Sequence, residues 1–227
     1  MRKSLFFLII IIISAPLFAG DIATFVNLGF SLDSNYYMFG QYGISAETYN
    51  SYAEIYFVDV HKNKFVSGGV NKSEFDGPVQ LGQTGFGAFM NLYSEVGDKS
   101  KNLKIDHLLS GRLIYLLING EEPKEELSFR DFEGGNKYRV LLIQKSYEED
   151  EKISSTFHLN VFVTDKSGET KSHIVGLPDY KREDVRQYRI KQIMFSPDEA
   201  SLVVVIEKEF STKTGISIRY MVETFTL

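Results

Sequence analysis

The sequence predicts a mainly β protein built from antiparallel four-stranded meanders, with one short helical insertion. Short apolar runs rich in aromatic and β-branched residues alternate with turn sequences, which is typical of strands joined by hairpins. The order of strand, turn and strand recurs in three partial copies, at about residues 22–70, 127–176 and 186–227. Helical spacing of apolar residues is concentrated in one stretch, residues 86–97.

The first copy shows the pattern most completely. An apolar strand ends at Phe30 and is followed by Ser, Leu, Asp, Ser and Asn at residues 31–35. Ser, Asp and Asn side chains bond nearby backbone N–H groups, so we expect a hairpin turn in which Asp33 is a structural acceptor. Two further strands, at residues 55–58 and from residue 65 onward, complete the four-stranded meander.

A similar turn occurs in the third copy. Phe-Ser-Pro-Asp at residues 195–198 lies between apolar runs at residues 188–194 and 202–206. The fixed φ of proline suits the second position of a type I turn. We therefore expect Asp198 to accept backbone N–H bonds in its turn, as Asp33 does in the first copy.

These motifs resemble the repeat of TolB-type β-propellers, in which Phe-Ser-Pro-Asp is followed by an apolar strand. The arrangement over residues 23–60 and 195–225 is also similar to a bacterial family of uncharacterised predicted secreted proteins. That family places a loop containing Tyr and Gly between the halves of its first unit. The sequence departs from the repeat at three positions: Leu32 replaces Pro, and Ser34 and Glu199 replace Gly.

The number of copies bears on how the meanders are arranged. Propellers have four to eight blades, of about 40–45 residues each in the common repeats. Three partial copies therefore predict an open or degenerate propeller, with a sandwich as the alternative arrangement. We expect one β-rich domain over residues 20–227, with the helical insertion at about residues 80–110.

The first 19 residues have the pattern of a secretory signal peptide. Arg2 and Lys3 precede an apolar run, and Ala19 is a small residue at a cleavage position. The alternative is a retained membrane anchor, but a spanning helix needs about 20 apolar residues and Pro16 interrupts this run. The sequence thus predicts cleavage after Ala19, export to the periplasm or beyond, and no transmembrane segment in the mature chain. Disulfides are excluded because there is no cysteine.

The helical insertion is predicted from an aromatic stripe. Phe86, Phe89, Met90 and Tyr93 have helical spacing, and Gly97 is expected to end the helix. We expect this stripe to pack against a sheet, with a cofactor groove as the less common use of such a face.

The rest of the chain predicts further strands and turns. A continuous apolar run at residues 113–118 and an alternating one at residues 157–163 are expected to be strands. The acidic run at residues 148–151 lacks the spacing and glycine of a calcium loop, so it predicts a hairpin tip. Residues 179–184 are expected to form a charged loop. A structural turn is predicted from Asp165 to Gly168, with glycine at the position of positive φ.

The sequence contains no pattern that indicates catalysis, a metal or a cofactor. It has no Gly-x-Ser-x-Gly, no His-Glu-x-x-His and no phosphate-binding loop. Its four histidines, at positions 61, 107, 158 and 173, have no spacing typical of metal ligands. The formal net charge of −5 does not favour binding to nucleic acid.

We therefore expect a non-enzymatic binding or scaffold protein of the cell envelope. One alternative is a small outer-membrane β-barrel, favoured by the export signal and the aromatic content. The run at residues 202–206 opposes it, because it is apolar on both faces. The other alternative is a hydrolase in which two carboxylates that are distant in sequence meet in space.

The expected partner-binding surface is a loop at residues 41–53, whose partner would be another envelope protein. Binding residues lie disproportionately on loops that a rigid scaffold holds in place. Tyrosine supplies a large contact area at a low entropic cost, while glycine permits sharp turns and polar side chains add hydrogen bonds. The candidate residues are Tyr42, Gly43, Glu47, Tyr49, Asn50 and Tyr52. The alternative is that these tyrosines cover the edge of the first sheet.

Overall fold

The computed structural model describes residues 20–227, except residues 78, 81, 151 and 213. The predicted signal peptide lies outside the described residues. The elements begin with β1 (Thr24–Ser31), β2 (Tyr36–Ile44), β3 (Ser51–Asp59), β4 (Lys64–Phe75), α1 (Phe86–Glu95), α2 (Gly97–Asn102), β5 (Ile105–Asp106) and β6 (Arg112–Leu116). They continue with β7 (Glu126–Arg130), β8 (Lys137–Glu149), β9 (Lys152–Thr164), β10 (Thr170–Glu183), β11 (Val185–Phe195), β12 (Ser201–Thr212) and β13 (Gly215–Thr226).

The strands form three antiparallel sheets. Sheet 1 has the order β4-β3-β2-β1-β5, sheet 2 the order β10-β9-β8-β7, and sheet 3 the order β13-β12-β11-β6. Neighbours in each sheet are mostly consecutive in the chain and are joined by hairpins, so the predicted mainly β fold of four-stranded meanders is confirmed. The third copy contributes only three consecutive strands, and β6 fills its fourth position from an earlier part of the chain.

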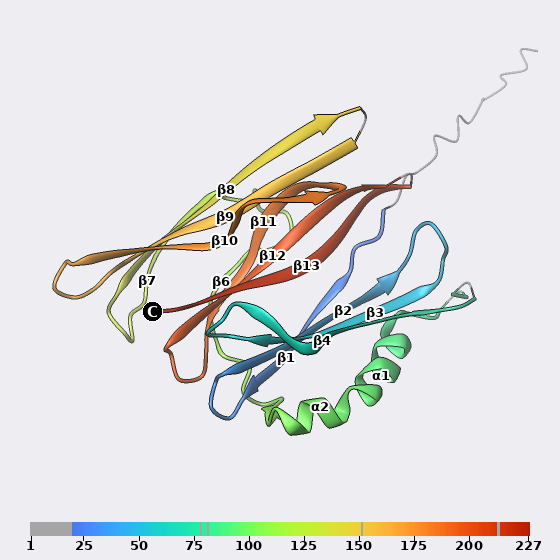
Figure 1. Ribbon diagram of the computed structural model, residues 1–227, viewed down its shortest axis with the longest axis horizontal. Coiled ribbons are helices and arrows are strands. Elements are labelled where there is room, and N and C mark those ends of the chain that lie inside the picture. Colours follow the sequence, from blue (N-terminus) through green and yellow to red (C-terminus); the bar gives the residue numbers. More distant parts are fainter. Residues whose placement is uncertain (1–19, 78, 81, 151, 213) are drawn as a thin grey trace, which may run out of the picture.

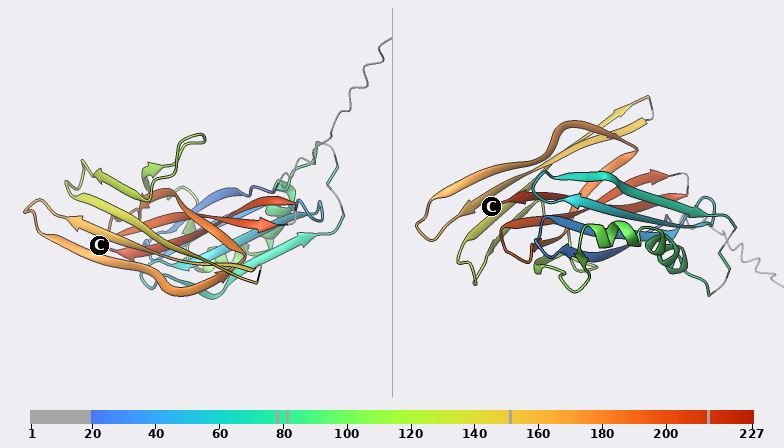
Figure 2. Two further views of the ribbon diagram at one scale, coloured as in Figure 1. Left: turned by 90° about the horizontal axis from the view of Figure 1, so that it is seen from above. Right: turned by 60° about the horizontal axis from the view of Figure 1, so that its bottom comes forward.

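Sheet 3 lies between the other two sheets, although it comes last in the chain (Figures 1 and 2). Its strand β12 is buried on both faces. Leu202, Val204 and Ile206 pack in the core shared with sheet 2. Val203 and Val205 pack in the core shared with sheet 1. In a strand that is covered on both faces, every side chain is buried, so apolar and polar residues do not alternate. This explains the continuous apolar run at residues 202–206.

The two helices cover the outer face of sheet 1 (Figure 1). The predicted helix is present as α1, but its buried face differs from the predicted stripe. Phe89 and Leu92 are buried against sheet 1, whereas Phe86 and Met90 are about half exposed. Gly97 does not end the helical region, because it begins α2. No helix in the described part of the chain is long and apolar enough to cross a membrane.

The charged stretch at residues 179–184 is mostly strand, which corrects the predicted loop. Strand β10 continues to Glu183, and its pairing with β9 shifts register between Leu177 and Arg182. The shift leaves the intervening residues, including Pro178, free of ladder bonds, and proline tolerates such a bulge because it has no N–H to donate. The bulge brings Arg182 back into register opposite Ser155.

Candidate binding site

The predicted loop at residues 41–53 is mostly a hairpin. Strands β2 and β3 continue past its predicted ends, with Tyr42 opposite Ala53, Gly43 opposite Tyr52 and Ile44 opposite Ser51. Only residues 45–50 form the turn that joins these strands. The predicted loop was therefore too long. Its polar residues indicated a loop, but they belong to paired strands whose two faces are covered by other elements.

Three of the candidate residues lie in the packed part of this hairpin. The Tyr42 ring faces helix α1, with its centroid 5.3 Å from that of Phe89. Tyr52 faces sheet 3, is 8% exposed and donates a hydrogen bond of 3.0 Å to Asp21. Gly43 lies against the Tyr52 ring, and a β-carbon at this position would be 2.4 Å from the Tyr52 hydroxyl oxygen. Tyr52 is therefore buried in the hairpin, whereas Tyr42 and Gly43 are half-buried.

The other three candidates lie on the turn. Tyr49 is 64% exposed and adopts a positive φ of 59°. Glu47 is exposed as well. The side-chain amide of Asn50 donates a hydrogen bond of 3.2 Å to the Glu74 carboxylate on the neighbouring strand β4. This bond fixes the turn to sheet 1. The turn therefore presents one aromatic ring and one carboxylate to solvent from an anchored backbone.

Two cavities lie at this end of the molecule, with volumes of about 580 and 560 Å³. Asp21 and Ser45 line both of them. Tyr42, Gly43 and Tyr49 line the first cavity, and Glu47 lines the second. The first cavity is also lined by Gly20, Ile22, Thr24, Ile44, Ala46, Gln83, Thr84, Gly85 and Thr214. The second is also lined by Glu54, Tyr56, Lys72, Asp184, Lys208, Phe210, Ser211, Thr212, Ser217 and Arg219.

Four carboxylates line the second cavity, and two of them, Asp21 and Glu54, are paired with cations. Asp21 pairs with Arg219, whose guanidinium lies 4.2 Å above the centroid of the Tyr52 ring. Glu54 pairs with Lys72 at 2.9 Å and also accepts hydrogen bonds from Tyr56 and Gln41. Burial raises the pKa of the Glu54 carboxyl, but hydrogen bonds from Tyr56 and Lys72 outweigh it, so the net pKa is below the usual value. Glu54 is therefore ionised at neutral pH.

Lys208 on β12 also lines the second cavity. Burial lowers the pKa of its amino group to about 8, with the negative charge of Glu54 acting in the opposite direction. The amino group lies 5.3 Å from the centroid of the Phe210 ring. No local pattern in the sequence marked Lys208, Asp21 or Arg219, because residues up to 198 positions apart meet only when the sheets stack.

The predicted turns at Asp33 and Asp198 have the same geometry. Each aspartate accepts a bond of 2.6 Å from the serine hydroxyl two residues earlier and one of 3.2 Å from the amide two residues later. Ser34 and Glu199, which replace glycine in the repeat, both have a positive φ, of 59° and 58°. Both side chains form contacts with distant parts of the chain. The Ser34 hydroxyl accepts a hydrogen bond from the Asp198 backbone amide, and the Glu199 carboxylate forms an ion pair with Arg112.

Replacing Asp198 with alanine is expected to lower the free energy of unfolding by about 0.5–2 kcal/mol, because the turn loses a side-chain acceptor for backbone N–H groups. Chemical denaturation of the exported protein measures this change. Alanine at Asp179, an exposed aspartate on β10, is the matched control and should change stability little. An Asp198 variant as stable as the wild type would show that this acceptor does not stabilise the turn.

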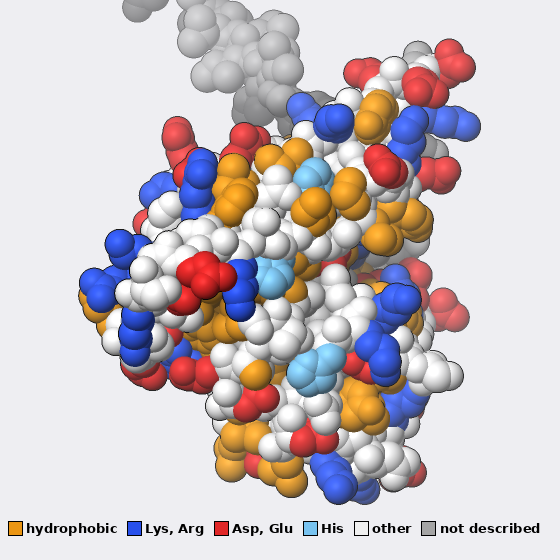
Figure 3. All heavy atoms as spheres, turned by 60° about the vertical axis from the view of Figure 1, so that its left-hand side comes forward, with side chains coloured by type: hydrophobic (Ala, Val, Ile, Leu, Met, Phe, Trp, Pro, Cys, Tyr) orange, Lys and Arg blue, Asp and Glu red, His pale blue; other side chains and the backbone are white. Residues whose placement is uncertain are grey.

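The remaining predicted features lie in turns or on the surface. Asp165 accepts a bond of 2.8 Å from the Ser167 amide, and Gly168 has a φ of 91°. Strand β8 ends within the acidic run, at Glu149, and Asp150 turns the chain. Figure 3 shows histidines on one face separated by other side chains. Among the described residues, no group of three His, Asp or Glu side chains could hold a metal ion.

These features define a class: a mainly β protein of three stacked antiparallel sheets, with two cavities at one end, beneath a hairpin turn. The chain belongs to a family described as "Predicted secreted protein (DUF2259)", whose model matches residues 38–226. The description supports the export that the signal-peptide pattern predicts. No curated protein and no solved structure matches the chain.

Proposed function

We propose that this chain is an exported, non-enzymatic binding or scaffold protein that uses the β2–β3 turn and the cavities beneath it to bind another envelope protein. The observation that carries the proposal is the position of the turn: Ser45, at its start, lines both cavities, and Tyr49 and Glu47 each line one of them. Exposed aromatic and polar side chains on an anchored turn are typical of recognition loops.

The pairing of Asp21 and Glu54 in the second cavity supports binding rather than hydrolysis by these two carboxylates. A glycosidase of the common type needs two carboxyl groups, one of which is protonated and donates a proton. Both Glu54 oxygens accept hydrogen bonds, and the pKa of this carboxyl is lowered rather than raised. Asp21 is neutralised by Arg219. These ion pairs fix the positions of the charged side chains, and a partner protein can recognise the polar surface that they form.

We also infer that the three meanders are related repeats of the TolB propeller type. The supporting observation is the shared bonding of two turns that belong to different sheets. Ser31 accepts a bond of 2.9 Å from the Tyr36 amide, and Ser196 accepts one of 3.0 Å from the Ser201 amide. Each serine donates in turn to the aspartate two residues later.

Site-specific crosslinking tests the proposed surface. A photo-crosslinking amino acid placed at Tyr49 of the exported protein is expected to give a discrete adduct with an envelope protein in living cells. The same amino acid at Phe132, which is 87% exposed on the β7–β8 turn, is the matched control and should not give that adduct. Electrophoresis and mass spectrometry of the adducts measure the result.

A second variant links the adduct to the turn. With the crosslinker at Glu47, replacing Tyr49 with serine is expected to abolish the adduct while leaving the melting temperature unchanged, because Tyr49 is mostly exposed. Absence of any adduct from Tyr49 and Glu47, or identical adducts from Phe132, would contradict the proposal.

A further inference from the structure

A third cavity, of about 390 Å³, lies where the edges of the three sheets meet. It is lined by the β3–β4 hairpin of sheet 1, by β10 of sheet 2 and by β13 of sheet 3. We propose that this cavity binds an amphiphile with one apolar chain and a compact anionic head, and that Arg182 binds the head. The inference is independent of the proposed partner surface, since this cavity shares no lining residue with the other two.

Arg182 is held in place by aromatic rings. Its guanidinium lies 4.7 Å from the centroid of Phe157, 5.0 Å from that of Tyr180 and 5.9 Å from that of Tyr188. These rings belong to β9, β10 and β11, so the guanidinium is clamped between sheets 2 and 3. Cation–π contacts orient a guanidinium without using its N–H donors. These contacts fix the guanidinium beside the cavity.

One N–H donor of Arg182 is buried and unused. The Nη1 atom of Arg182 has almost no solvent contact and forms no hydrogen bond with the described residues. A buried charged donor without an acceptor is destabilising, because it has lost water and gained nothing in exchange. Nη1 itself is closed off from the cavity, so an anion there would meet the part of Arg182 that lines the cavity. A guanidinium already fixed in position binds such an anion with little further loss of freedom.

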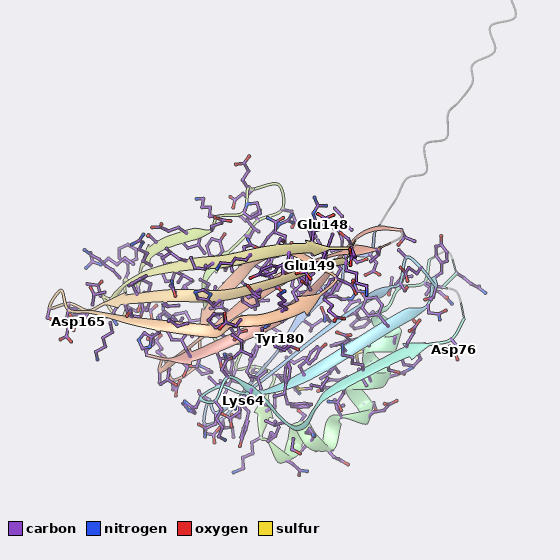
Figure 4. All side chains as sticks on the ribbon, turned by 45° about the horizontal axis from the view of Figure 1, so that its top comes forward. Lys64, Asp76, Glu148, Glu149, Asp165 and Tyr180 are labelled. Atoms are coloured by element: carbon purple, nitrogen blue, oxygen red, sulfur yellow. The ribbon has the colours of Figure 1, made fainter. Side chains whose placement is uncertain are left out.

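The other side of the cavity is apolar. Val58, Met221 and Val222 contribute its wall, and Phe65 and Leu177 stand at facing edges of sheets 1 and 2. Phe65 is 49% exposed and Leu177 is 59% exposed, so two large apolar side chains at this cavity remain in contact with water. Figure 4 labels Lys64, at the start of β4, and Tyr180, on β10, which mark these two edges. An apolar chain between the edges would cover both side chains.

The charges of the lining favour an anion over a cation. Lys62, Lys64 and Arg182 line the cavity with a single carboxylate, that of Glu223. Glu223 is 6% exposed and accepts a hydrogen bond of 2.5 Å from Asn63. Burial raises the pKa of this carboxyl, while the hydrogen bond from Asn63 and the positive charge of Arg182 act in the opposite direction. Lys62 pairs with Asp59 at 2.6 Å, so Arg182 and Lys64 supply the positive charge.

Calorimetric titration of the exported protein with dodecanoate tests the proposal. Dodecyl maltoside and dodecyltrimethylammonium, used below their critical micelle concentrations, are neutral and cationic controls with the same chain. We expect saturable binding of one dodecanoate, and at least about tenfold weaker binding of both controls, the ratio that loss of one charge-assisted hydrogen bond would give.

Three variants assign the roles within the site. Arg182→Met is expected to weaken dodecanoate binding about tenfold, whereas Arg139→Met, which removes an exposed arginine on β8, should leave it unchanged. Leu177→Ser, at an exposed position, tests the apolar part without a risk to the core and should also weaken binding. Glu223→Gln is expected to tighten binding, because it removes the repelling charge.

Two results would overturn the proposal. Equal affinity of the wild type and Arg182→Met for dodecanoate, with Leu177→Ser unchanged as well, would show that the cavity is not the binding site. Stronger binding of dodecyltrimethylammonium, lost in Glu223→Gln, would assign the cavity to a cationic head instead. A melting curve of each variant, recorded beside the titration, separates lost binding from lost folding.

Discussion

Replacing Phe157 with alanine is expected to lower the free energy of unfolding by about 3–5 kcal/mol. Phe157, on β9, has no exposed surface and belongs to the core between sheets 2 and 3. Its ring centroid lies 4.3 Å from that of Tyr188 on β11, and the Arg182 guanidinium covers it at 4.7 Å. Alanine would leave a cavity that neither sheet can close, because the strands on both sides are held by their hydrogen-bonded neighbours.

Chemical denaturation at neutral pH measures this loss. Phe132→Ala is the matched control, since Phe132 belongs to the same sheet's β7–β8 turn and is 87% exposed. Its expected change is within about 0.5 kcal/mol. A loss of less than about 1 kcal/mol for Phe157→Ala would contradict the close packing of sheet 2 on sheet 3. Because Phe157 also supports Arg182, the variant should bind dodecanoate more weakly.

Replacing Arg112 with methionine is expected to lower the free energy of unfolding by about 3 kcal/mol, because it leaves a buried carboxylate without its cation. Arg112 joins two turns: it pairs with Asp131 on the β7–β8 turn at 3.0 Å and with Glu199 on the β11–β12 turn at 2.7 Å. Its guanidinium also lies 4.5 Å from the centroid of Phe195. The Asp131 side chain is only 3% exposed, so its charge has little contact with water.

The pH dependence of stability identifies the carboxylate responsible. Burial raises the pKa of Asp131, but hydrogen bonds from Arg112 and the Gly134 amide outweigh it, so the folded-state pKa lies below the ordinary 3.8. An aspartate with a lowered pKa stabilises the fold above its unfolded-state pKa and loses this effect as the pH falls through the folded-state value. The wild type should therefore lose this contribution below about pH 4.

A double variant provides the control for this prediction. Arg112→Met combined with Asp131→Asn removes both charges and should recover part of the stability lost in the single variant. It should also lose less stability on acidification than the wild type. A double variant no more stable than Arg112→Met would show that the stacking of Arg112 on Phe195, rather than the ion pair, accounts for the loss.

Several elements could be predicted from the sequence because their signals are local. The turns at Asp33 and Asp198 follow from side chains that bond backbone groups two residues away. The apolar run at residues 202–206 indicated a strand with two covered faces, and β12 is buried on both. The helical spacing located α1, although it did not show which of its residues would be buried.

The candidate surface was only partly predictable. Nothing in residues 41–53 distinguishes Tyr49, which is exposed, from Tyr52, which is buried and bonded to Asp21. The difference arises from the hairpin register, which points Tyr52 at sheet 3 and leaves Tyr49 on the turn. The helix α1 that covers Tyr42 begins at Phe86, more than 40 positions along the chain.

The sequence by itself determined that this protein consists of strands, turns and one helical insertion, and it carries the pattern of an export signal, because periodicity and turn chemistry act over a few residues. Only the tertiary structure decided that sheet 3 lies between the others, that β6 completes it, and that Ser34 and Glu199 contact Asp198 and Arg112. Only the tertiary structure places the Arg182 guanidinium beside aromatic rings from three strands. Its Nη1 atom forms no hydrogen bond with the described residues. Such contacts join positions far apart in the chain, and their energies depend on how whole sheets pack, which no local pattern specifies.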